Sequence, residues 1–227
     1  MSANDTILIE MQYLPPIQYF AKLYQFDKMQ LEAKENYFKG TYRNRCHIAG
    51  ANGLQRLSIP LRKGKNRQQS IREVEISNDE KWQSEHWHSI KSAYGNSPFF
   101  EYYVDELQPF YKKEYELLWD WNRDLVNKMM ELVGIDCLIE ETVEFLKPTE
   151  QGTELPVFDF RNSIQPKVSR QKEDANFKEV AYGQVFIEKH GFLPNLSILD
   201  LLFCQGPNAI EILRQSVNQG LSVVHRN

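Results

Sequence analysis

Two arginines separated by one residue, Arg43 and Arg45, lie in the stretch TYRNRCHIAGANG, just before a turn that contains glycine. If this stretch is a β-strand, both side chains project to one face, because side chains alternate along a strand. Two guanidinium groups on one face can bind a phosphate bidentately. Asn44 would then face the opposite side, where burial would require its amide to be hydrogen bonded. The alternative is that both arginines form surface ion pairs.

The arginine pair belongs to a basic strip, residues 37–72, that contains no Asp or Glu. Its nine cations are Lys39, Arg43, Arg45, Arg56, Arg62, Lys63, Lys65, Arg67 and Arg72. The whole chain holds 27 Lys and Arg and 31 Asp and Glu, so the remainder has 18 cations against 31 acids, a net charge of −13. An exposed strip of this kind attracts anions, whereas acids from distant segments would neutralise it if they fold over it. Lys63, in the loop RKGKNRQQ, is a further candidate anion ligand.

His86 and His47 are the candidate acid–base residues. His86 shares one face of an expected helix with Ile90 and Tyr94, and an imidazole titrates near neutral pH, as a general base requires. The alternative is a partly exposed helix histidine without a catalytic role. His47 lies beside the arginines, whose charge would lower its pKa and favour the neutral base. His86 and His88 lie about 200° apart around a helix, so they cannot share a metal ion, and no metal site is predicted.

Four neutral side chains complete the candidate ligand-binding set: Gln12, Tyr19, Tyr42 and Tyr94. Gln12 ends an expected strand just before Pro15, which is where ligand crevices open in parallel α/β sheets. It could equally be a capping amide that holds the next loop. The tyrosines can line a pocket or fill the core. The stretch AGANG lacks the ending and the strand-to-helix context of a phosphate loop, so it is interpreted as a hairpin turn and no cofactor is expected.

The elements that position these residues follow from hydrophobic periodicity. The opening predicts a β-α-β unit, with a strand around 7–11, a helix ending at Gln25 and a second strand from Lys28. The basic strip predicts strands over 41–48, 54–61 and 70–77, with AGANG as the turn of a hairpin.

The rest of the chain is predicted to be mainly helical. Residues 78–134 have a helical pattern that Pro109 interrupts and Gly134 ends. A strand over 135–145 follows, residues 149–177 are expected to form a loop or lid, and the tail holds two short helices separated by Gly206 and Pro207. The predicted fold class is α/β, with α+β as the alternative, in one domain spanning 1–227.

Composition indicates an ordinary globular protein, with 41% hydrophobic and 26% charged residues. No secretory signal and no run of about 18 apolar residues is found, so a soluble, cytoplasmic protein without a membrane span is expected. Three widely separated cysteines, Cys46, Cys137 and Cys204, suit a reducing compartment and are interpreted as packing residues.

Three segments and one spaced pattern together resemble the WbqC-like family over nearly the whole chain. The segments are QYLPPIQYF, TYRNRCHIAGANGLQRLSIPL and NLSILDLLFCQGP, and the pattern consists of Trp82, Ile90, Tyr94 and PFF at 98–100. Tyr13 and Gln18 depart from the proline and glycine that the family often has there. The resemblance implies a bacterial protein of surface-polysaccharide, O-antigen-type biosynthesis that acts on activated sugar or acyl intermediates. Nucleotide sugars and acyl-coenzyme A carry pyrophosphate, which agrees with the basic strip.

The leading hypothesis is therefore a transferase-like enzyme whose basic hairpins bind the phosphates of an activated donor. One alternative is a non-catalytic nucleic-acid-binding module that uses the same strip, with Tyr37, Phe38 and Tyr42 as stacking platforms. The acidic remainder of the chain and a pI near 5.8 favour the first hypothesis. A third possibility, compatible with both, is a protein-interaction module that forms a homodimer through the aromatic segment 99–121.

Overall fold

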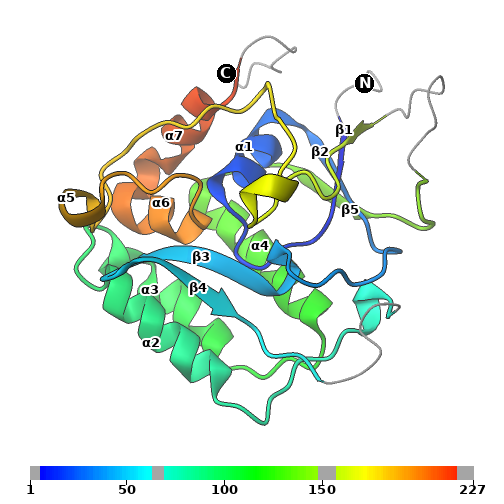
Figure 1. Cartoon of the computed structure of the whole chain (residues 1–227), viewed down its shortest axis with the longest axis horizontal. Coiled ribbons are helices and arrows are strands. Elements are labelled where there is room, and N and C mark those ends of the chain that lie inside the picture. The colour runs from blue at the N-terminus through cyan, green and yellow to red at the C-terminus, as the bar shows by residue number, and fades with distance from the viewer. Residues whose placement is uncertain (1–5, 63–68, 148–156, 219–227) are drawn as a thin grey trace.

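A parallel sheet lies toward one side of the computed structural model, which describes residues 6–62, 69–147 and 157–218 (Figure 1). Its four strands lie in the order β5-β2-β1-β6, and every neighbouring pair is parallel. The bounds are Thr6–Ile9 for β1, Lys28–Leu31 for β2, Leu138–Glu141 for β5 and Phe158–Asp159 for β6. The fold is therefore α/β, as predicted.

The β-α-β opening is also as predicted, with α1 (Ile17–Gln25) connecting β1 to β2. Ile7, Leu8 and Ile9 are all buried, because a parallel strand in the middle of a sheet is covered on both faces. Strand β6 lies within the segment that was expected to be a loop or lid. Part of that segment is therefore a strand of the sheet, and residues 149–156 lie outside the described part of the chain.

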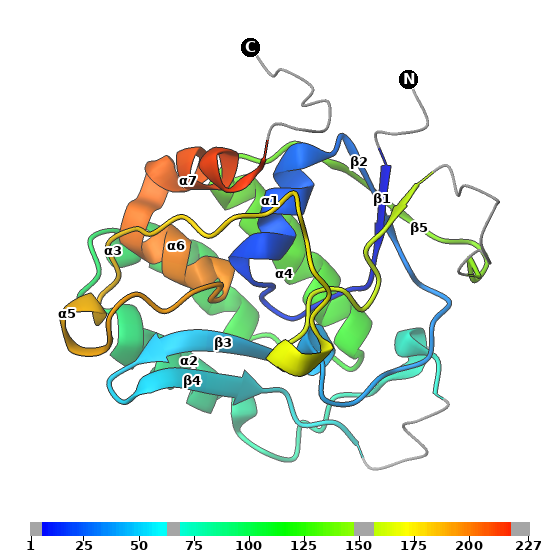
Figure 2. The same ribbon diagram turned by 45° about the horizontal axis from the view of Figure 1, so that its top comes forward.

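An antiparallel hairpin of β3 (Arg45–Gly50) and β4 (Gly53–Ser58) packs between α2 and α6 (Figure 2). Gly53 has φ +98°, so AGANG is the predicted turn. The residues before it, Tyr42–Asn44, form a 3-10 turn that the Thr41 side chain caps by accepting a hydrogen bond from the Arg43 amide. The prediction that Arg43 and Arg45 share one strand face is therefore wrong.

The third predicted strand, over 70–77, is wrong as well. Ile71–Glu73 is a short 3-10 helix, and only a single bridge joins Leu61 to Ile76. The backbone of this stretch bonds to several different elements, since the Ile71 amide donates to the Glu35 carbonyl and the Val74 carbonyl accepts from the Leu118 amide. Its apolar side chains are buried by the core rather than by a neighbouring strand.

The helices are interrupted and ended at the residues that were predicted to do so. Pro109 lies in the 3-10 turn that ends α3, and Gly134, with φ +82°, ends α4. The tail helices α6 and α7 are separated by the turn Gly206–Asn208. The bounds are Trp82–Tyr94 for α2, Phe100–Leu107 for α3, Leu118–Val133 for α4, Ile187–His190 for α5, Ile198–Gln205 for α6 and Ala209–Ser216 for α7.

Aromatic side chains from helices and from the segments between elements fill the core around Trp121. Trp82, Tyr13, Tyr111 and Tyr115 all pack against its rings. Most aromatic residues of segment 99–121 are thus internal, and Tyr102 is the strongly exposed one. A homodimer through this segment stays a prediction. Within the described residues, no helix combines the length and the apolar character needed to cross a membrane.

Candidate functional site

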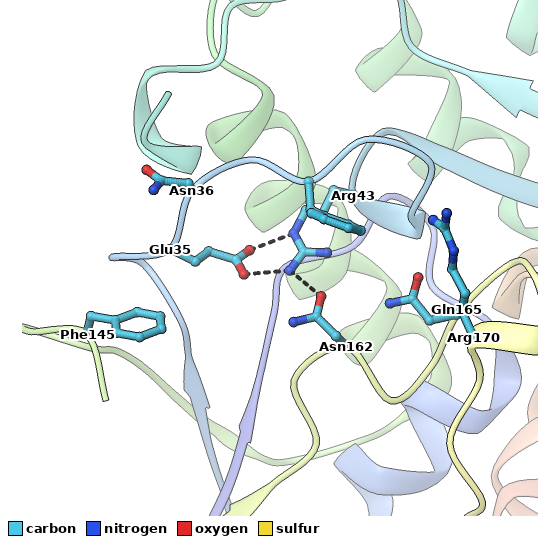
Figure 3. Close-up of a pocket in the computed structure, with 8 residues that line it drawn as sticks. Glu35, Asn36, Arg43, Phe145, Asn162, Gln165 and Arg170 are labelled. Atoms are coloured by element: carbon cyan, nitrogen blue, oxygen red, sulfur yellow. Dashed lines mark hydrogen bonds and ion pairs between the residues drawn. The ribbon is translucent and has the colours of Figure 1, made fainter. Parts of the chain in front are cut away.

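A pocket of about 450 Å³ opens at the carboxyl end of the parallel sheet (Figure 3). The loop after β2 contributes four of its residues, the loop after β5 contributes one, and the segment after β6 contributes three: Glu35, Asn36, Phe38, Arg43, Phe145, Asn162, Gln165 and Arg170. Open α/β sheets bind ligands outside the carboxyl ends of their strands. The pocket is therefore where this fold predicts a site.

A buried ion pair between Glu35 and Arg43 forms the inner wall of the pocket. The Nε and Nη2 atoms of Arg43 donate to the two Glu35 carboxylate oxygens at 2.7 and 2.5 Å. Arg43 is only 1% exposed, and its other nitrogen, Nη1, donates to Thr41. Burial raises the pKa of the Glu35 carboxyl, Arg43 partly offsets this, and the charges of Glu10 and Glu32 add to the rise.

Further buried acids tie the loops of the pocket together. Glu10, directly after β1, accepts hydrogen bonds from the Asn162 amide at 2.8 Å and from the Gln12 side chain at 2.9 Å. Glu32, directly after β2, accepts from Thr142 at 2.8 Å and from Arg161 at 2.7 Å. Segments that follow all four strands are thus linked, and the pocket walls are held in place without a ligand.

Polar side chains of the pocket remain without a partner in the described part of the chain, Gln165 and Arg170 among them. Gln165 is 6% exposed, and neither end of its amide hydrogen bonds to any described residue. The guanidinium of Arg170 is exposed and forms no ion pair or hydrogen bond within the described chain. Phe38 and Phe145 add half-exposed rings, at 54% and 47%. The pocket can therefore accept a ligand that has an anionic group, hydrogen-bonding groups and an apolar face.

Comparison with known proteins assigns the chain to a family. The sequence model of the WbqC-like protein family matches residues 11–212. This chain belongs to the WbqC-like family. A protein of Mycobacterium tuberculosis (strain ATCC 25618 / H37Rv), Uncharacterized protein Rv1507c, is 25% identical over 223 residues, which cover 91% of this chain and 96% of the relative. No solved structure matches. All residues that line the pocket fall within the family match.

Of the predicted ligand-binding residues, Arg43 lines the pocket of this WbqC-like protein. Gln12 does not line it but is fully buried in the loop that follows β1, where it donates to Glu10. Asn44 is buried, and its amide nitrogen donates to the Ile59 carbonyl at 2.9 Å, whereas its Oδ1 has no partner among the described residues, so the expectation that burial requires a hydrogen bond holds for the nitrogen only. Arg45 is half-buried on the hairpin, and Lys63 lies outside the described residues.

The three predicted tyrosines are core residues rather than pocket residues. The Tyr19 hydroxyl donates to the Glu10 carbonyl, and the Tyr94 hydroxyl accepts from the Ala49 amide at 3.0 Å. Tyr42 is buried against His47, with 3.4 Å between its hydroxyl and the histidine Nδ1. Of the two alternatives for these side chains, the core interpretation agrees with the structure.

Neither predicted histidine lines the pocket. His86 is buried, so the alternative of a partly exposed helix residue is wrong, and its Nδ1 lies 3.0 Å from the Tyr13 hydroxyl. Burial lowers the pKa of His86 to about 4. Burial, together with the charges of Arg45 and Arg56, also lowers the pKa of His47, which is the predicted direction. A catalytic role for either histidine would require a site other than this pocket.

The basic strip is partly neutralised by acids from outside it. Arg43 pairs with Glu35, Arg62 with Glu75 and Arg72 with Glu141. For these cations the neutralisation alternative is confirmed. Tyr37 and Tyr42 are buried, so their predicted role as stacking platforms is wrong, and Phe38 alone of the three is exposed.

Sequence reasoning missed Glu35, Phe145, Asn162, Gln165 and Arg170, because loops far apart in the chain bring them together. One signal was present for the acids near them. Both strands of the opening end in an apolar residue followed directly by glutamate, at Ile9-Glu10 and Leu31-Glu32. Two glutamates at the carboxyl ends of adjacent parallel strands indicate a polar site at that edge.

Protonation of His86 is expected to make the protein sensitive to acid. The folded pKa is depressed to about 4 against an unfolded value near 6.5, so only the unfolded chain binds this proton between these pH values. The stability that the neutral imidazole contributes, about 3 kcal/mol, is present above pH 6.5 and lost as the pH falls toward 4. Urea unfolding from pH 7.5 to 4 should show a shallower loss for His86→Gln than for the wild type.

The matched control is His88→Gln, on the same helix but exposed. This variant should keep the wild-type slope of unfolding free energy against pH. A His86→Gln slope equal to that of the wild type would show that His86 titrates alike in the folded and unfolded states.

Proposed function

We propose that this WbqC-like protein is a transferase-like enzyme of bacterial surface-polysaccharide biosynthesis, and that the pocket at the carboxyl end of the sheet binds its activated, phosphate-containing donor. The observation that carries the proposal is that some charged groups of the pocket are paired within the protein and one is not. The Glu35–Arg43 pair is bonded within the protein, whereas the Arg170 cation is left without a partner among the described residues. The resemblance to the family supplies the biosynthetic context.

Arg170 is the proposed phosphate ligand. Its guanidinium offers several N–H donors in one plane, which suits two oxygens of a phosphate group. Arg43 is less available, since all three of its nitrogens already contact Glu35, Thr41 or Asn162. Its proposed role is to hold the Glu35 carboxylate in position at the inner wall.

Glu35 is the proposed general base. Among the described residues that line the pocket it is the only carboxylate. In the proposed transfer, a hydroxyl oxygen of the acceptor forms the new bond to the transferred group of the donor. The leaving group, a nucleoside phosphate from a nucleotide sugar or the coenzyme A thiolate from a thioester, departs with the electron pair of the bond that breaks. The hydroxyl proton passes to the Glu35 carboxylate. The raised pKa of Glu35 makes it a better proton acceptor than an exposed carboxylate.

The cytoplasm is the proposed compartment. All three cysteines are buried, and none of them forms a disulfide within the described residues, which fits a reducing environment. Activated donors of this type are soluble anions, and the pocket offers one unpaired arginine for them.

The proposal is tested by calorimetric titration of nucleotide sugars and coenzyme A thioesters into the wild type and Arg170→Ala. We expect saturable binding of at least one such compound, and a loss of about 10-fold or more in Arg170→Ala, because a hydrogen bond to a charged group contributes about 1.5–3 kcal/mol. Lys172→Ala removes an exposed cation of the same segment and should bind like the wild type. Absence of saturable binding for every compound would overturn the proposal.

The nucleic-acid alternative has weaker support. Burial and the nearby charge of Arg56 lower the pKa of Arg45, and neither arginine forms an ion pair within the described residues. However, three arginines of the strip are paired with acids and two of the three proposed stacking rings are buried. Single-stranded nucleic acids require exposed aromatic platforms together with a continuous basic groove.

A further inference from the structure

We infer that the pocket recognises a sugar ring through neighbouring hydroxyl groups that bind the Gln165 amide, so the donor is a glycosyl phosphate compound rather than an acyl thioester. This inference rests on the proposed function, since it names the substrate class of the same pocket. It is carried by the unused amide of Gln165, by the groups around it and by its spacing from Arg170.

The side chain of Gln165 is largely buried, and its amide has no hydrogen-bond partner among the described residues. Its Oε1 atom is inaccessible and accepts no hydrogen bond, and its Nε2 atom donates none to the described residues. Other glutamines nearby are used: Gln171 donates to Gln18 at 3.1 Å, and Gln184 donates to the Leu193 carbonyl at 2.9 Å. A buried polar atom without a partner costs free energy, so a ligand that completes the hydrogen bonds of the Gln165 amide is favoured.

Hydroxyl groups are the ligand groups that best complete a glutamine amide. The amide presents an acceptor and a donor side by side, and half a rotation of its terminal group exchanges them without a change of shape. Each hydroxyl both donates and accepts. Two adjacent hydroxyls on a sugar ring can therefore bind both ends of the amide at once, whereas the hydrocarbon part of an acyl group offers neither function.

The neighbours of Gln165 suit the same ring. Figure 3 shows Asn162 beside Gln165 on the wall below Arg43, and the Asn162 oxygen accepts from Arg43 at 3.0 Å. This bond orients the Asn162 amide and leaves its nitrogen as a donor for the ligand. The exposed rings of Phe38 and Phe145 line the same space, and the C–H face of a sugar can pack on an aromatic ring.

The position of Arg170 fits a phosphate attached directly to the sugar. Gln165 and Arg170 come from one segment, five residues apart, and both line the pocket. A glycosyl donor places its phosphate on the ring itself, next to the hydroxyls. Gln12 also has an unpartnered, buried oxygen, but it does not line the pocket and donates to Glu10, so it carries no comparable argument.

The test compares four classes of probe by calorimetric titration. The first is nucleotide sugars (UDP-glucose, UDP-galactose and GDP-mannose), and the second is the nucleoside diphosphates alone. The third is UDP-2-deoxyglucose, and the fourth is acetyl-coenzyme A. We expect the wild type to bind at least one nucleotide sugar 10-fold or more tightly than its nucleoside diphosphate. The ratio of these two affinities should fall toward one in Gln165→Leu. Gln165→Glu, which keeps the shape and the acceptor but loses the donor, should give an intermediate ratio. Gln171→Leu, on the same segment, is the control and should keep the wild-type ratio.

The outcomes separate the two proposals. Equal binding of nucleotide sugars and nucleoside diphosphates, tighter binding of acetyl-coenzyme A, or an unchanged ratio in both folded Gln165 variants would overturn the sugar inference while the phosphate site survives. If no probe binds, the proposed function fails, and the inference fails with it. Thermal melts of each variant show that the affinities refer to folded protein.

Discussion

Replacing Asp174 by alanine is expected to lower the free energy of unfolding by about 3–5 kcal/mol, because it leaves the buried ammonium of Lys22 without its partner. Lys22 lies in α1 and is 1% exposed, and its Nζ is 2.8 Å from both Asp174 carboxylate oxygens. Gln18 also donates to Asp174 at 2.9 Å. Urea or guanidinium unfolding measures the loss, and Asp105→Ala, an exposed acid on α3, serves as the control.

The pH dependence of this loss identifies its cause. Burial already lowers the pKa of Lys22, and removal of Asp174 lowers it further. Because the pKa of Lys22 is lower in the folded protein than in the unfolded chain, the loss of unfolding free energy is largest at pH values where Lys22 is charged in the unfolded chain. This loss shrinks as the pH rises toward the pKa of lysine in the unfolded chain, near 10.4. The difference between variant and wild type should therefore be smaller at pH 9.5 than at pH 7. A difference that does not change with pH would argue against an unpaired lysine.

A double variant supplies a second check. Lys22→Met with Asp174→Ala removes both charges, and buried ion pairs replaced by apolar groups are often close to neutral. It should recover most of the stability that Asp174→Ala loses. The pair matters for the pocket because it fastens to α1 the segment that carries Asn162, Gln165 and Arg170 (Figure 1). Loosening of this segment should weaken ligand binding in the single variant.

The local patterns of the sequence were sufficient for the fold class. Apolar runs at Ile7–Ile9 and around Met29, separated by a helical pattern, predict two parallel strands with a crossover helix, and the structure has them. Gly134 ends a helix because it adopts a positive φ that other residues avoid. These predictions succeed because each depends on neighbours within a few residues.

Predictions of exposure failed where long-range partners decide it. His86 was given the alternative of a partly exposed helix residue, yet it is buried, and its Nδ1 lies 3.0 Å from the Tyr13 hydroxyl. Arg43 has the appearance of a free cation in an acid-free strip, yet Glu35, just outside the strip, buries it. The sequence shows that a charge is present, but its partners come from the tertiary fold.

The candidate site was only partly predictable for the same reason. Arg43 was singled out and does line the pocket, but the groups left free for a ligand, Gln165 and Arg170, come from a segment that was expected to be a loop or lid. That segment has few apolar residues and two prolines, so its strand β6, of two residues, gives almost no periodic signal. Without β6 there was no reason to place its following residues at the carboxyl end of the sheet.

Replacing Arg43 by methionine is expected to cost about 3–5 kcal/mol of unfolding free energy at pH 7.5, since it leaves Glu35 buried without its counter-ion. The effect should be strong because the charges of Glu10 and Glu32 also act on Glu35. Methionine is unbranched and can follow the path of the arginine stem, so the result reports chiefly on the lost charge. Arg62→Met, whose ion pair with Glu75 is exposed, should change stability by about 1 kcal/mol or less.

The stability deficit of the Arg43→Met variant should become smaller at acid pH. This direction of the pH dependence distinguishes an unpaired carboxylate from a packing defect. Without Arg43 the folded pKa of Glu35, already raised by burial, rises further above its unfolded value. The folded protein then holds a proton that the unfolded chain releases, so the stabilising contribution of that proton is present at low pH and lost as the pH rises through the folded pKa. The deficit against the wild type should therefore be smaller at pH 5 than at pH 7.5. Glu35→Gln with Arg43→Met should abolish this pH dependence, and a deficit that is the same at both pH values would point to lost packing instead.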